Sequence, residues 1–259
     1  QCFSGLTEEM YSLQEAEIAS FFKKRRSDSN KGDYGNILIF AGSFEMSGAA
    51  VMAARAAVNS GAGKVTLCFP DKAYNAIAPQ LTEPLLLPLR ANQNGRFCAV
   101  DFGRAKEALE KASAVLIGCG IGLDFDTEQF AVRVLKNAKC PVVIDADGIN
   151  AIAKDIDMLK ETEVQTVITP HPGEAARVLG CTAQDVQSDR ISAVKKLNEM
   201  TGGTVVLKGA GTLVIGKDEN SPFINTTGNA GMATGGSGDV LAGMLVSFIG
   251  QGLSVEDAA

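Results

Sequence analysis

The sequence predicts an α/β protein with a mostly parallel central sheet. Short continuous apolar runs at residues 36–41 (NILIFA), 114–118 (AVLIG) and 141–145 (PVVID) are typical of strands buried on both faces of such a sheet. Helix-like stretches separate these runs, and the sequence contains neither an internal repeat nor a low-complexity linker. We therefore expect residues 31–259 to form one α/β domain, preceded by a polar helical arm at residues 1–30.

Local signals support this alternation of strands and helices. Residues 47–63 are rich in alanine and end in glycine, as expected for a tightly packed helix with a glycine cap, and residues 64–69 (KVTLCF) are typical of a strand. Residues 204–215 combine two apolar runs with a Gly-Ala-Gly turn, which predicts a hairpin at one side of the sheet. Residues 255–259 resemble the first turn of a further helix, and we expect either a truncated end or a disordered tail there.

Composition and charge argue against several classes of protein. A net charge of −6 and a pI near 5.0, without a long basic run, argue against nucleic acid as the main partner. No apolar run approaches the roughly 20 residues that span a membrane, and the start lacks a signal-peptide pattern. Six cysteines occur singly and are predicted to be reduced core thiols, and His171, the only histidine, cannot join a multi-histidine metal site. A cytoplasmic enzyme is the expectation.

Residues 229–243 (NAGMATGGSGDVLAG) carry the strongest functional signal. Their glycines permit turns with φ > 0 and remove Cβ atoms, so successive N–H groups can point at one anion. Apolar residues then recur at helical spacing, which predicts a helix whose N-terminus favours negative charge. Asp239 lies at the mouth of that helix. Ser237 or Asp239 could simply cap the helix, but a carboxylate repels a neighbouring anion, so a catalytic base explains Asp239 better.

Other glycine-rich turns follow predicted strands, where parallel sheets bind ligands. The glycines at positions 118, 120 and 122 lack the spacing of a dinucleotide fingerprint, and residues 42–50 lack the Gly-Lys-Ser/Thr of a Walker P-loop. Two prolines fix the backbone around His171, which is unusual for a histidine that only decorates a surface; a turn histidine satisfied by neighbouring backbone is the alternative. Lys208 precedes Gly-Ala-Gly, which favours a phosphate contact over a solvated strand end.

The acidic residues near these turns are less decisive. Asp145 and Asp147 follow a predicted strand, and helix capping, metal-water contact and pocket lining all remain open for them. Glu174 follows the Pro-His-Pro turn and is expected to be a charge at a helix N-terminus rather than a catalyst.

Seven stretches together resemble the ribokinase-like NAD(P)H-hydrate dehydratases. They run in the order of the family over roughly residues 30–250, and their combination is highly specific, although the final Gly-Asp loop alone is shared by ribokinase-like kinases. The stretches are KGDYG (31–35), AGSFEMSGAA (41–50), NSGAGKVT (59–66), DADGIN (145–150), TPHPGE (169–174), LKGAGT (207–212) and GGSGD (235–239). The resemblance implies a three-layer α/β/α sandwich.

The resemblance also implies a reaction and a set of site residues. ADP, or ATP in eukaryotic relatives, phosphorylates the 6-hydroxyl of hydrated NADH or NADPH, and elimination of phosphate restores the reduced nicotinamide. Asp239 would be the base, beside an anion hole at Gly236, Ser237 and Gly238. The adenosine phosphates would contact Lys208, Gly209, Ala210, Gly211, Thr212 and Gly238. The hydrated dinucleotide would contact Ala49, Gly120, His171 and Asp239. Mg²⁺ is expected, with ligands that the sequence leaves unknown.

The chain departs from the family pattern at two points. Asn30 stands where the family commonly has histidine, and the usual last helices are missing after Ala259. Relatives suggest a homotetramer and an NAD(P)H-hydrate epimerase as a partner. The alternatives are a small-molecule kinase of the same fold, of the hydroxymethylpyrimidine or hydroxyethylthiazole type, and a nucleotide-binding regulator without turnover. Preference for NADH or NADPH hydrate, and for ADP or ATP, stays open.

Overall fold

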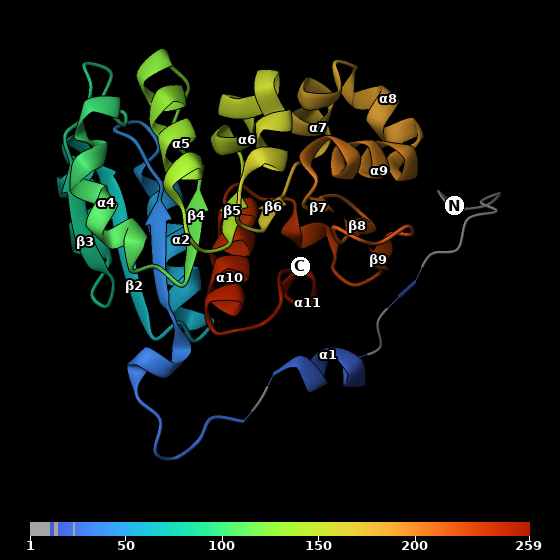
Figure 1. Ribbon diagram of the computed structural model, residues 1–259, viewed down its shortest axis with the longest axis horizontal. Coiled ribbons are helices and arrows are strands. Elements are labelled where there is room, and N and C mark those ends of the chain that lie inside the picture. The colour runs from blue at the N-terminus through green and yellow to red at the C-terminus, as the bar shows by residue number, and fades with distance from the viewer. Residues whose placement is uncertain (1–10, 13–14, 23) are drawn as a thin grey trace.

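The computed structural model describes residues 11–12, 15–22 and 24–259, and within them nine strands form one sheet in the order β3-β2-β1-β4-β5-β6-β7-β8-β9 (Figure 1). Neighbouring strands from β3 to β7 are parallel, and β8 and β9 are added antiparallel. The strands are β1 Asn36–Phe40, β2 Lys64–Pro70, β3 Leu85–Leu89, β4 Ala114–Ile117, β5 Val142–Ile144, β6 Thr166–Ile168, β7 Thr204–Leu207, β8 Thr212–Ile215 and β9 Phe223–Asn225. The predicted mostly parallel α/β sheet is confirmed.

Helices cover both faces of this sheet. In Figure 1, α4 to α9 lie on one face, and α2 and α10 lie on the other. The helices are α1 Glu15–Phe21, α2 Ser47–Asn59, α3 Tyr74–Ile77, α4 Phe102–Glu110, α5 Phe125–Asn137, α6 Asp147–Ile152, α7 Pro172–Leu179, α8 Ala183–Ser188, α9 Arg190–Thr201, α10 Ser237–Gly250 and α11 Val255–Ala258. Helix α2 is followed by Gly61 at φ 95°, which agrees with the predicted glycine end.

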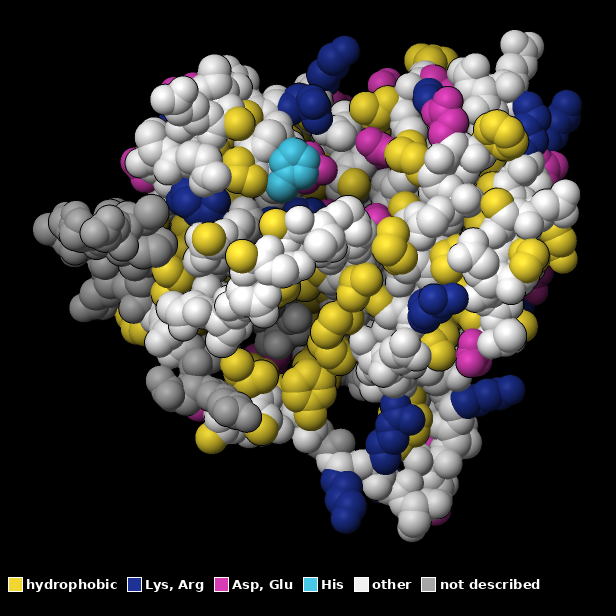
Figure 2. Space-filling model, turned by 180° about the vertical axis from the view of Figure 1, so that it is seen from behind, with side chains coloured by type: hydrophobic (Ala, Val, Ile, Leu, Met, Phe, Trp, Pro, Cys, Tyr) yellow, Lys and Arg dark blue, Asp and Glu magenta, His cyan; other side chains and the backbone are white. Residues whose placement is uncertain are grey.

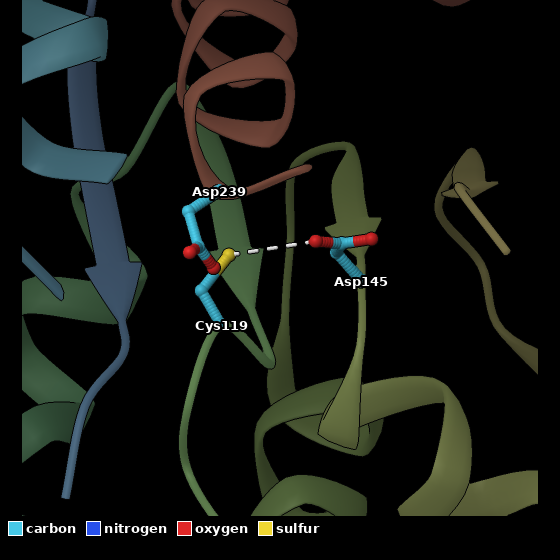
Figure 3. A group of neighbouring side chains, drawn as sticks. All are labelled: Cys119, Asp145 and Asp239. Atoms are coloured by element: carbon cyan, nitrogen blue, oxygen red, sulfur yellow. Dashed lines mark hydrogen bonds between the residues drawn. The ribbon is translucent and has the colours of Figure 1, made fainter. Parts of the chain in front are cut away.

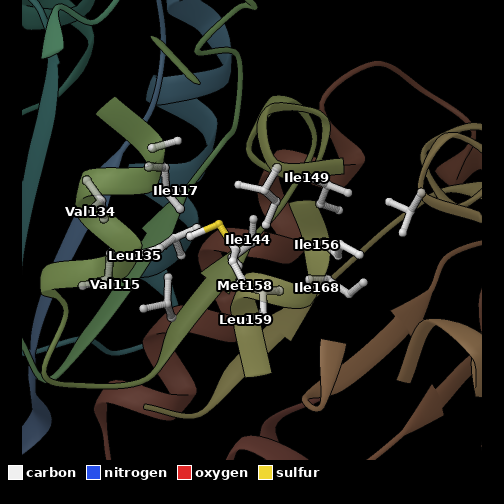
Figure 4. Close-up of a cluster of buried hydrophobic side chains, with 14 of the residues drawn as sticks. Val115, Ile117, Val134, Leu135, Ile144, Ile149, Ile156, Met158, Leu159 and Ile168 are labelled. Atoms are coloured by element: carbon white, nitrogen blue, oxygen red, sulfur yellow. The ribbon is translucent and has the colours of Figure 1, made fainter. Parts of the chain in front are cut away.

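Alternate residues of the central strands supply the two hydrophobic cores. Leu38 and Phe40 of β1 face the core under α4 to α9, whereas Ile37 and Ile39 face the core under α2 and α10. This two-sided burial explains why the strands are continuous apolar runs. Figure 4 shows part of the first core, where Val115, Ile117, Ile144 and Ile168 from three strands meet Val134 and Leu135 of α5 and Ile149 of α6.

Helix α10 packs closely on α2 because Gly243 has no side chain. A Cβ at Gly243 would collide with the backbone carbonyl of Ala53. The buried face of α10 includes Leu245, Val246 and Ile249. Val240, Leu241 and Met244, part of the apolar series that predicts the helix, are more than one-third exposed. The predicted helix is therefore confirmed, but its apolar residues extend beyond the buried face.

The strand order reverses between β1 and β4, since the chain continues from β1 to β2 on one side and reaches β4 on the other. At such a switch point the loops after the two strands diverge and leave room for a ligand beyond their carboxyl ends. Next to the strand ends the two loops are still in contact, because the Gly42 N–H donates a 2.8 Å hydrogen bond to the Cys119 carbonyl. The fold thus positions the site where the sequence places its glycine-rich turns.

The ends of the described chain contact the α10 side of the molecule. Of the expected arm at residues 1–30, residues 1–10, 13–14 and 23 lie outside the described residues, and α1 is its helical part. The Phe22 ring lies 5.0 Å from the Phe248 ring, edge to face. Asn30 caps the short 3-10 helix at residues 31–34 by accepting a 2.8 Å hydrogen bond from Gly32 N–H. The alternative of a disordered tail is wrong for residues 255–259, because α11 is helical and Val255 is buried.

The described part of the chain shows no membrane-spanning helix and no disulfide. None of the helices described there combines the length and apolar character that a membrane crossing requires. Five of the six cysteines are described, and all five are free thiols; Cys2 lies outside the described residues. Cys68 and Cys119 are buried as expected, Cys98 and Cys140 are half-buried, and Cys181 is exposed. The prediction of core thiols is therefore wrong for Cys181.

Candidate active site

Helix α10 begins without a side-chain cap. Gly236 is the N-cap residue, in the left-handed region at φ 93°, and it offers no side chain to the first turn. The Ser237 hydroxyl donates instead to the carbonyls of Met232 at 2.7 Å and Thr234 at 3.1 Å. Capping by Ser237 or Asp239, the alternative weighed from the sequence, is therefore wrong. The Ser237 N–H donates a long, 3.4 Å hydrogen bond to the Thr234 carbonyl. The other N–H groups of this first turn have no side-chain cap, so they can bind an anion.

Asp239 in the first turn of α10 faces two residues from neighbouring strand ends (Figure 3). Cys119 follows β4 and Asp145 follows β5, and one ligand atom from each of the three residues lies within 4.8 Å of the others. The Cys119 thiol donates to Asp145 Oδ2 at 3.7 Å. Burial, together with the charge of Asp145, raises the pKa of the Asp239 carboxyl. Asp239 is thus a carboxylate whose environment favours taking up a proton.

Lys208 lies on the other side of Asp145. Its ammonium group is 2.7 Å from Asp145 Oδ1, which also accepts a 2.6 Å hydrogen bond from the Thr169 hydroxyl. Asp145 is only 2% exposed, so this charge-assisted pairing compensates for its burial. Burial works to lower the pKa of Lys208, but the charges of Asp145 and Glu174 outweigh it and leave that pKa raised. Lys208 is therefore a cation throughout the neutral range.

His171 and Glu174 form a reciprocal cap at the start of α7. His171 Nδ1 accepts from the Gly173 N–H at 2.9 Å, and Glu174 Oε2 accepts from the His171 N–H at 2.8 Å. The role of helix N-terminal charge predicted for Glu174 is confirmed. Glu174 Oε2 also lies 3.9 Å from Lys208 Nζ, and burial raises the pKa of Glu174. The His171 ring remains 56% exposed and is the cyan side chain on the face in Figure 2.

These contacts join five side chains, from the start of α7, the ends of β5 and β7 and the first turn of α10, into one network. It runs from His171 through Glu174, Lys208 and Asp145 to Asp239. Three carboxylates in this network face one lysine, so the charge around Asp239 is negative when all are ionised. Such a group, next to uncapped N–H donors, can accept a proton from a bound hydroxyl while the helix terminus holds a phosphate.

Among the predicted nucleotide-binding residues, Lys208 lies next to the N-terminus of α10. A Cβ on Gly238 would lie 3.4 Å from Lys208 Nζ, so the lysine lies directly beside this glycine. The residues after Lys208 form the β7 to β8 turn, with Gly209 at φ 147° and Gly211 at φ 68°. Ala210 is exposed at the tip of this turn, and the Thr212 hydroxyl donates to the Gly209 carbonyl at 3.0 Å. The predicted hairpin is confirmed.

Two of the predicted substrate residues contact each other. Gly120 adopts φ 64°, and a Cβ there would come within 2.7 Å of the Ala49 Cβ, so a glycine is needed for the loop to pass α2. Asp147, whose role the sequence leaves undecided, accepts a 2.9 Å hydrogen bond from the Gly122 N–H and thereby holds the end of this glycine loop. A third predicted substrate residue, His171, follows a different strand, β6, and its Nε2 lies 3.3 Å from Glu174 Oε1.

Sequence reasoning missed three residues of this site. Cys119 and Thr169 contact Asp145, and nothing local in the sequence marks either contact. Arg190 donates to the carbonyls of Leu207 at 3.0 Å and Gly211 at 3.3 Å, and so supports the β7 to β8 turn. Its only sequence signal is its position at the start of a helix.

The fold and the site together define a ribokinase-like α/β protein with a helix terminus that no side chain caps and an adjacent carboxylate. The family model described as NAD(P)H-hydrate dehydratase matches residues 37–259. The chain belongs to this NAD(P)H-hydrate dehydratase family.

Individual relatives agree with this assignment. The chain is 39% identical to the ADP-dependent (S)-NAD(P)H-hydrate dehydratase of Neisseria meningitidis, over 92% of this chain and 77% of that protein. It is 37% identical to the bifunctional NAD(P)H-hydrate repair enzyme Nnr of Moorella thermoacetica, over 95% of this chain and 46% of that protein. A solved ADP/ATP-dependent NAD(P)H-hydrate dehydratase from Bacillus subtilis, co-crystallised with ATP and Mg²⁺, superposes with a TM-score of 0.82 at 31% identity, covering 96% of this chain and 84% of that chain. The chain thus spans about half the length of the bifunctional relatives it matches.

Proposed function

We infer that the protein catalyses the ADP-dependent dehydration of (6S)-hydrated NADH and NADPH, which returns the damaged cofactors to NADH and NADPH. The observation that carries this proposal is the position of Asp239, a carboxylate with a raised pKa in the first turn of a helix that no side chain caps. Family membership supplies the substrate class, and relatives named as dehydratases support it.

In the first step, Asp239 accepts the proton of the substrate 6-hydroxyl as its oxygen attacks the terminal phosphorus of ADP. The bond from that phosphorus to its bridging oxygen breaks, and AMP leaves. The N–H groups from Gly236 to Gly238 stabilise the charge that develops on the phosphoryl oxygens, and the positive end of α10 adds to this effect. A raised pKa suits Asp239 to this task because a general base works best when its pKa is near the operating pH.

In the second step, the electron pair of the ring nitrogen expels phosphate from C6. The proton on C5 leaves to the departing phosphate, and the C5–C6 double bond is restored. The net reaction converts the hydrate and ADP into reduced dinucleotide, AMP and phosphate. No oxidation takes place, which classes the activity as a lyase reaction coupled to phosphoryl transfer.

The remaining site residues divide between the two ligands in this proposal. The nucleotide phosphates lie between Gly238 and the turn formed by Lys208, Gly209, Ala210, Gly211 and Thr212. The hydrated dinucleotide contacts Ala49, Gly120 and His171. The contact between Ala49 and Gly120, and the proximity of Lys208 to Gly238, support this division.

The side chains around Asp239 fit Mg²⁺ as an ion that arrives with the nucleotide. Asp145 and Asp239 offer the hard oxygen donors that Mg²⁺ prefers, but the third close donor is the thiol of Cys119. Asp145 would therefore hold the ion together with phosphate oxygens and water, which leaves Asp239 free to act as the base. When bound, it would neutralise part of the charge on the transferred phosphoryl group.

The organisation of the protein completes the proposal. Residues 31–259 form one domain, to which residues 1–30 attach as an arm. The active form is a homotetramer in the cytoplasm. The bifunctional names of relatives support a functional link to an NAD(P)H-hydrate epimerase.

The direct test is turnover of chemically hydrated NADH, followed by recovery of NADH absorbance, with ADP and ATP compared. Recovery with release of one phosphate per NADH is the expected result. No recovery, combined with phosphorylation of hydroxymethylpyrimidine or hydroxyethylthiazole, would indicate the kinase alternative. Nucleotide binding without either reaction would indicate a regulator.

A structure with ADP bound tests which residues contact the nucleotide and which contact the hydrated dinucleotide. The nucleotide phosphates are expected against residues 208–212 and 235–238. ADP bound against residues 118–122 alone would refute the assignment.

A further inference from the structure

The thiol of Cys119 lies where it could be a metal ligand, a role that the proposed reaction does not use. Cys119 Sγ lies 3.7 Å from Asp145 Oδ2, and Asp239 offers a third ligand atom within 4.8 Å of both. A tetrahedral zinc ion with bonds of about 2.3 Å to sulfur and about 2.0 Å to oxygen separates the two ligand atoms by about 3.5 Å. The sulfur and oxygen of Cys119 and Asp145 are therefore already close to the spacing that one ion requires (Figure 3).

The two oxygens of Asp145 have separate roles, so ion binding leaves the core contacts in place. Oδ1 accepts from Lys208 and Thr169, whereas Oδ2 faces the thiol. Binding an ion at Oδ2 replaces the thiol proton and leaves the Lys208 pair intact. Asp239 is only half-buried, so an ion can reach these three side chains from solvent on its side.

The charge of the group also favours a dication. Three carboxylates, those of Asp145, Asp239 and Glu174, lie around one ammonium group, that of Lys208, so this cluster carries a negative surplus when all are ionised. A divalent ion would remove that surplus. A thiolate donor selects a soft or borderline ion such as Zn²⁺ over Mg²⁺.

We propose that Cys119, Asp145 and Asp239 form a binding site for a thiophilic divalent cation of the Zn²⁺ class, with a fourth position open to water. Binding releases the Cys119 proton to solvent and changes no oxidation state. The site stands independently of the reaction. Its consequence for turnover rests on the proposed function, because an ion held by Asp239 prevents this carboxylate from accepting the hydroxyl proton. The cation is therefore an inhibitor of the dehydration.

Direct binding tests the site without any assay of activity. Co²⁺ serves as the probe for the Zn²⁺ position, since a charge-transfer band in the near ultraviolet marks a sulfur ligand and intense visible bands mark four-coordination. The parent protein is expected to show both, and Zn²⁺ but not excess Mg²⁺ should abolish them. Cys119→Ser should lose the sulfur band and weaken binding by more than about 100-fold, since even outer contacts of metal sites contribute about 10–100-fold. Asp239→Asn should keep the sulfur band with reduced affinity.

Matched controls separate this thiol from the others. Cys181→Ser and Cys140→Ser remove an exposed and a half-buried cysteine and should leave the spectrum unchanged. A sulfur band that survives in Cys119→Ser, or a parent protein without one, overturns the proposal. Thermal unfolding checks that each variant is folded, and Asp239→Asn supplies the test if Cys119→Ser is not.

Inhibition is measured last, with each variant compared with its own metal-free rate. Zn²⁺ should inhibit the parent and both control variants, and a folded, active Cys119→Ser should resist it. A Co²⁺ spectrum with the expected sulfur band but undiminished turnover would leave the metal site standing and would refute Asp239 as the base.

Discussion

Asp239→Asn separates catalysis from structure, because asparagine keeps the size of the side chain but accepts no proton. If Asp239 is the general base, turnover of hydrated NADH should fall by about 10²–10⁴-fold, the usual contribution of a positioned base. The affinity for ADP should stay constant or improve, since a negative charge beside the phosphates is removed. In the parent protein, turnover should decline as pH falls through the raised pKa of Asp239, since the protonated carboxyl cannot act as base.

The same substitution should stabilise the fold. Ligand atoms of Asp239 and Asp145 lie within 4.8 Å of each other. Two unit charges about 5 Å apart repel by about 3 kcal/mol at an effective dielectric constant near 20. Attraction by Lys208 and solvent screening of the half-buried Asp239 reduce this, which leaves a net gain on the order of 1 kcal/mol. For a chain of this size, such a gain raises Tm by about 2–4 °C.

The pH dependence of this gain follows from the direction of the pKa shift. Asp239 has a higher pKa in the folded than in the unfolded state, so its ionised form opposes folding at neutral pH. Below the ordinary pKa of 3.8 the carboxyl is protonated in both states, and the advantage of the variant should disappear. The assays are steady-state turnover, ADP titration and thermal unfolding across pH. Turnover within a few-fold of the parent, or loss of ADP binding together with activity, would refute the reasoning.

Three further substitutions test the surrounding network. His171→Ala should cost about 0.5–2 kcal/mol of stability, because the helix cap is lost. It should also raise KM for the hydrate but not for ADP, because a ligand contact of about 1.5–3 kcal/mol is lost. His171→Asn should restore Tm without restoring that KM, and a change confined to the KM for ADP would assign His171 to the other ligand. Lys208→Met should destabilise the fold by about 3–5 kcal/mol, because it leaves the buried Asp145 carboxylate without its cation. In urea unfolding, the double variant Lys208→Met/Asp145→Asn should recover much of that loss. If the losses of the two single variants simply add in the double variant, the pairing is contradicted. Ala146 has φ 49° and ψ −118°, a conformation that favours glycine. Ala146→Gly should therefore raise Tm, because it relieves about 1–3 kcal/mol of strain against an entropic cost of about 0.5–1 kcal/mol. A lower Tm would argue against strain at this position.

The sequence by itself determined the fold class and the position of the glycine-rich loop before α10. Strands β1, β4 and β5 are buried on both faces, so their continuous apolar runs are a local signal that needs no knowledge of neighbours. The glycine-rich loop before α10 is equally local, since its backbone angles depend on the absence of side chains. Strand β3 gave no such signal, because it is an edge strand that contains Pro88 and is largely only partly buried.

Only the tertiary structure decided what the charged residues contact. The sequence assigns Lys208 to phosphate, but its ammonium lies 2.7 Å from Asp145, a residue 63 positions earlier in the chain. That contact exists because β5 and β7 lie near each other in the sheet and because a buried carboxylate requires a partner. The approach of Cys119 to Asp239 has the same origin, since it depends on the packing of α10 beside the carboxyl end of β4. Apolar periodicity and turn chemistry are written in neighbouring residues, whereas ion pairs and donor groups arise from strand order, which no short stretch of sequence contains.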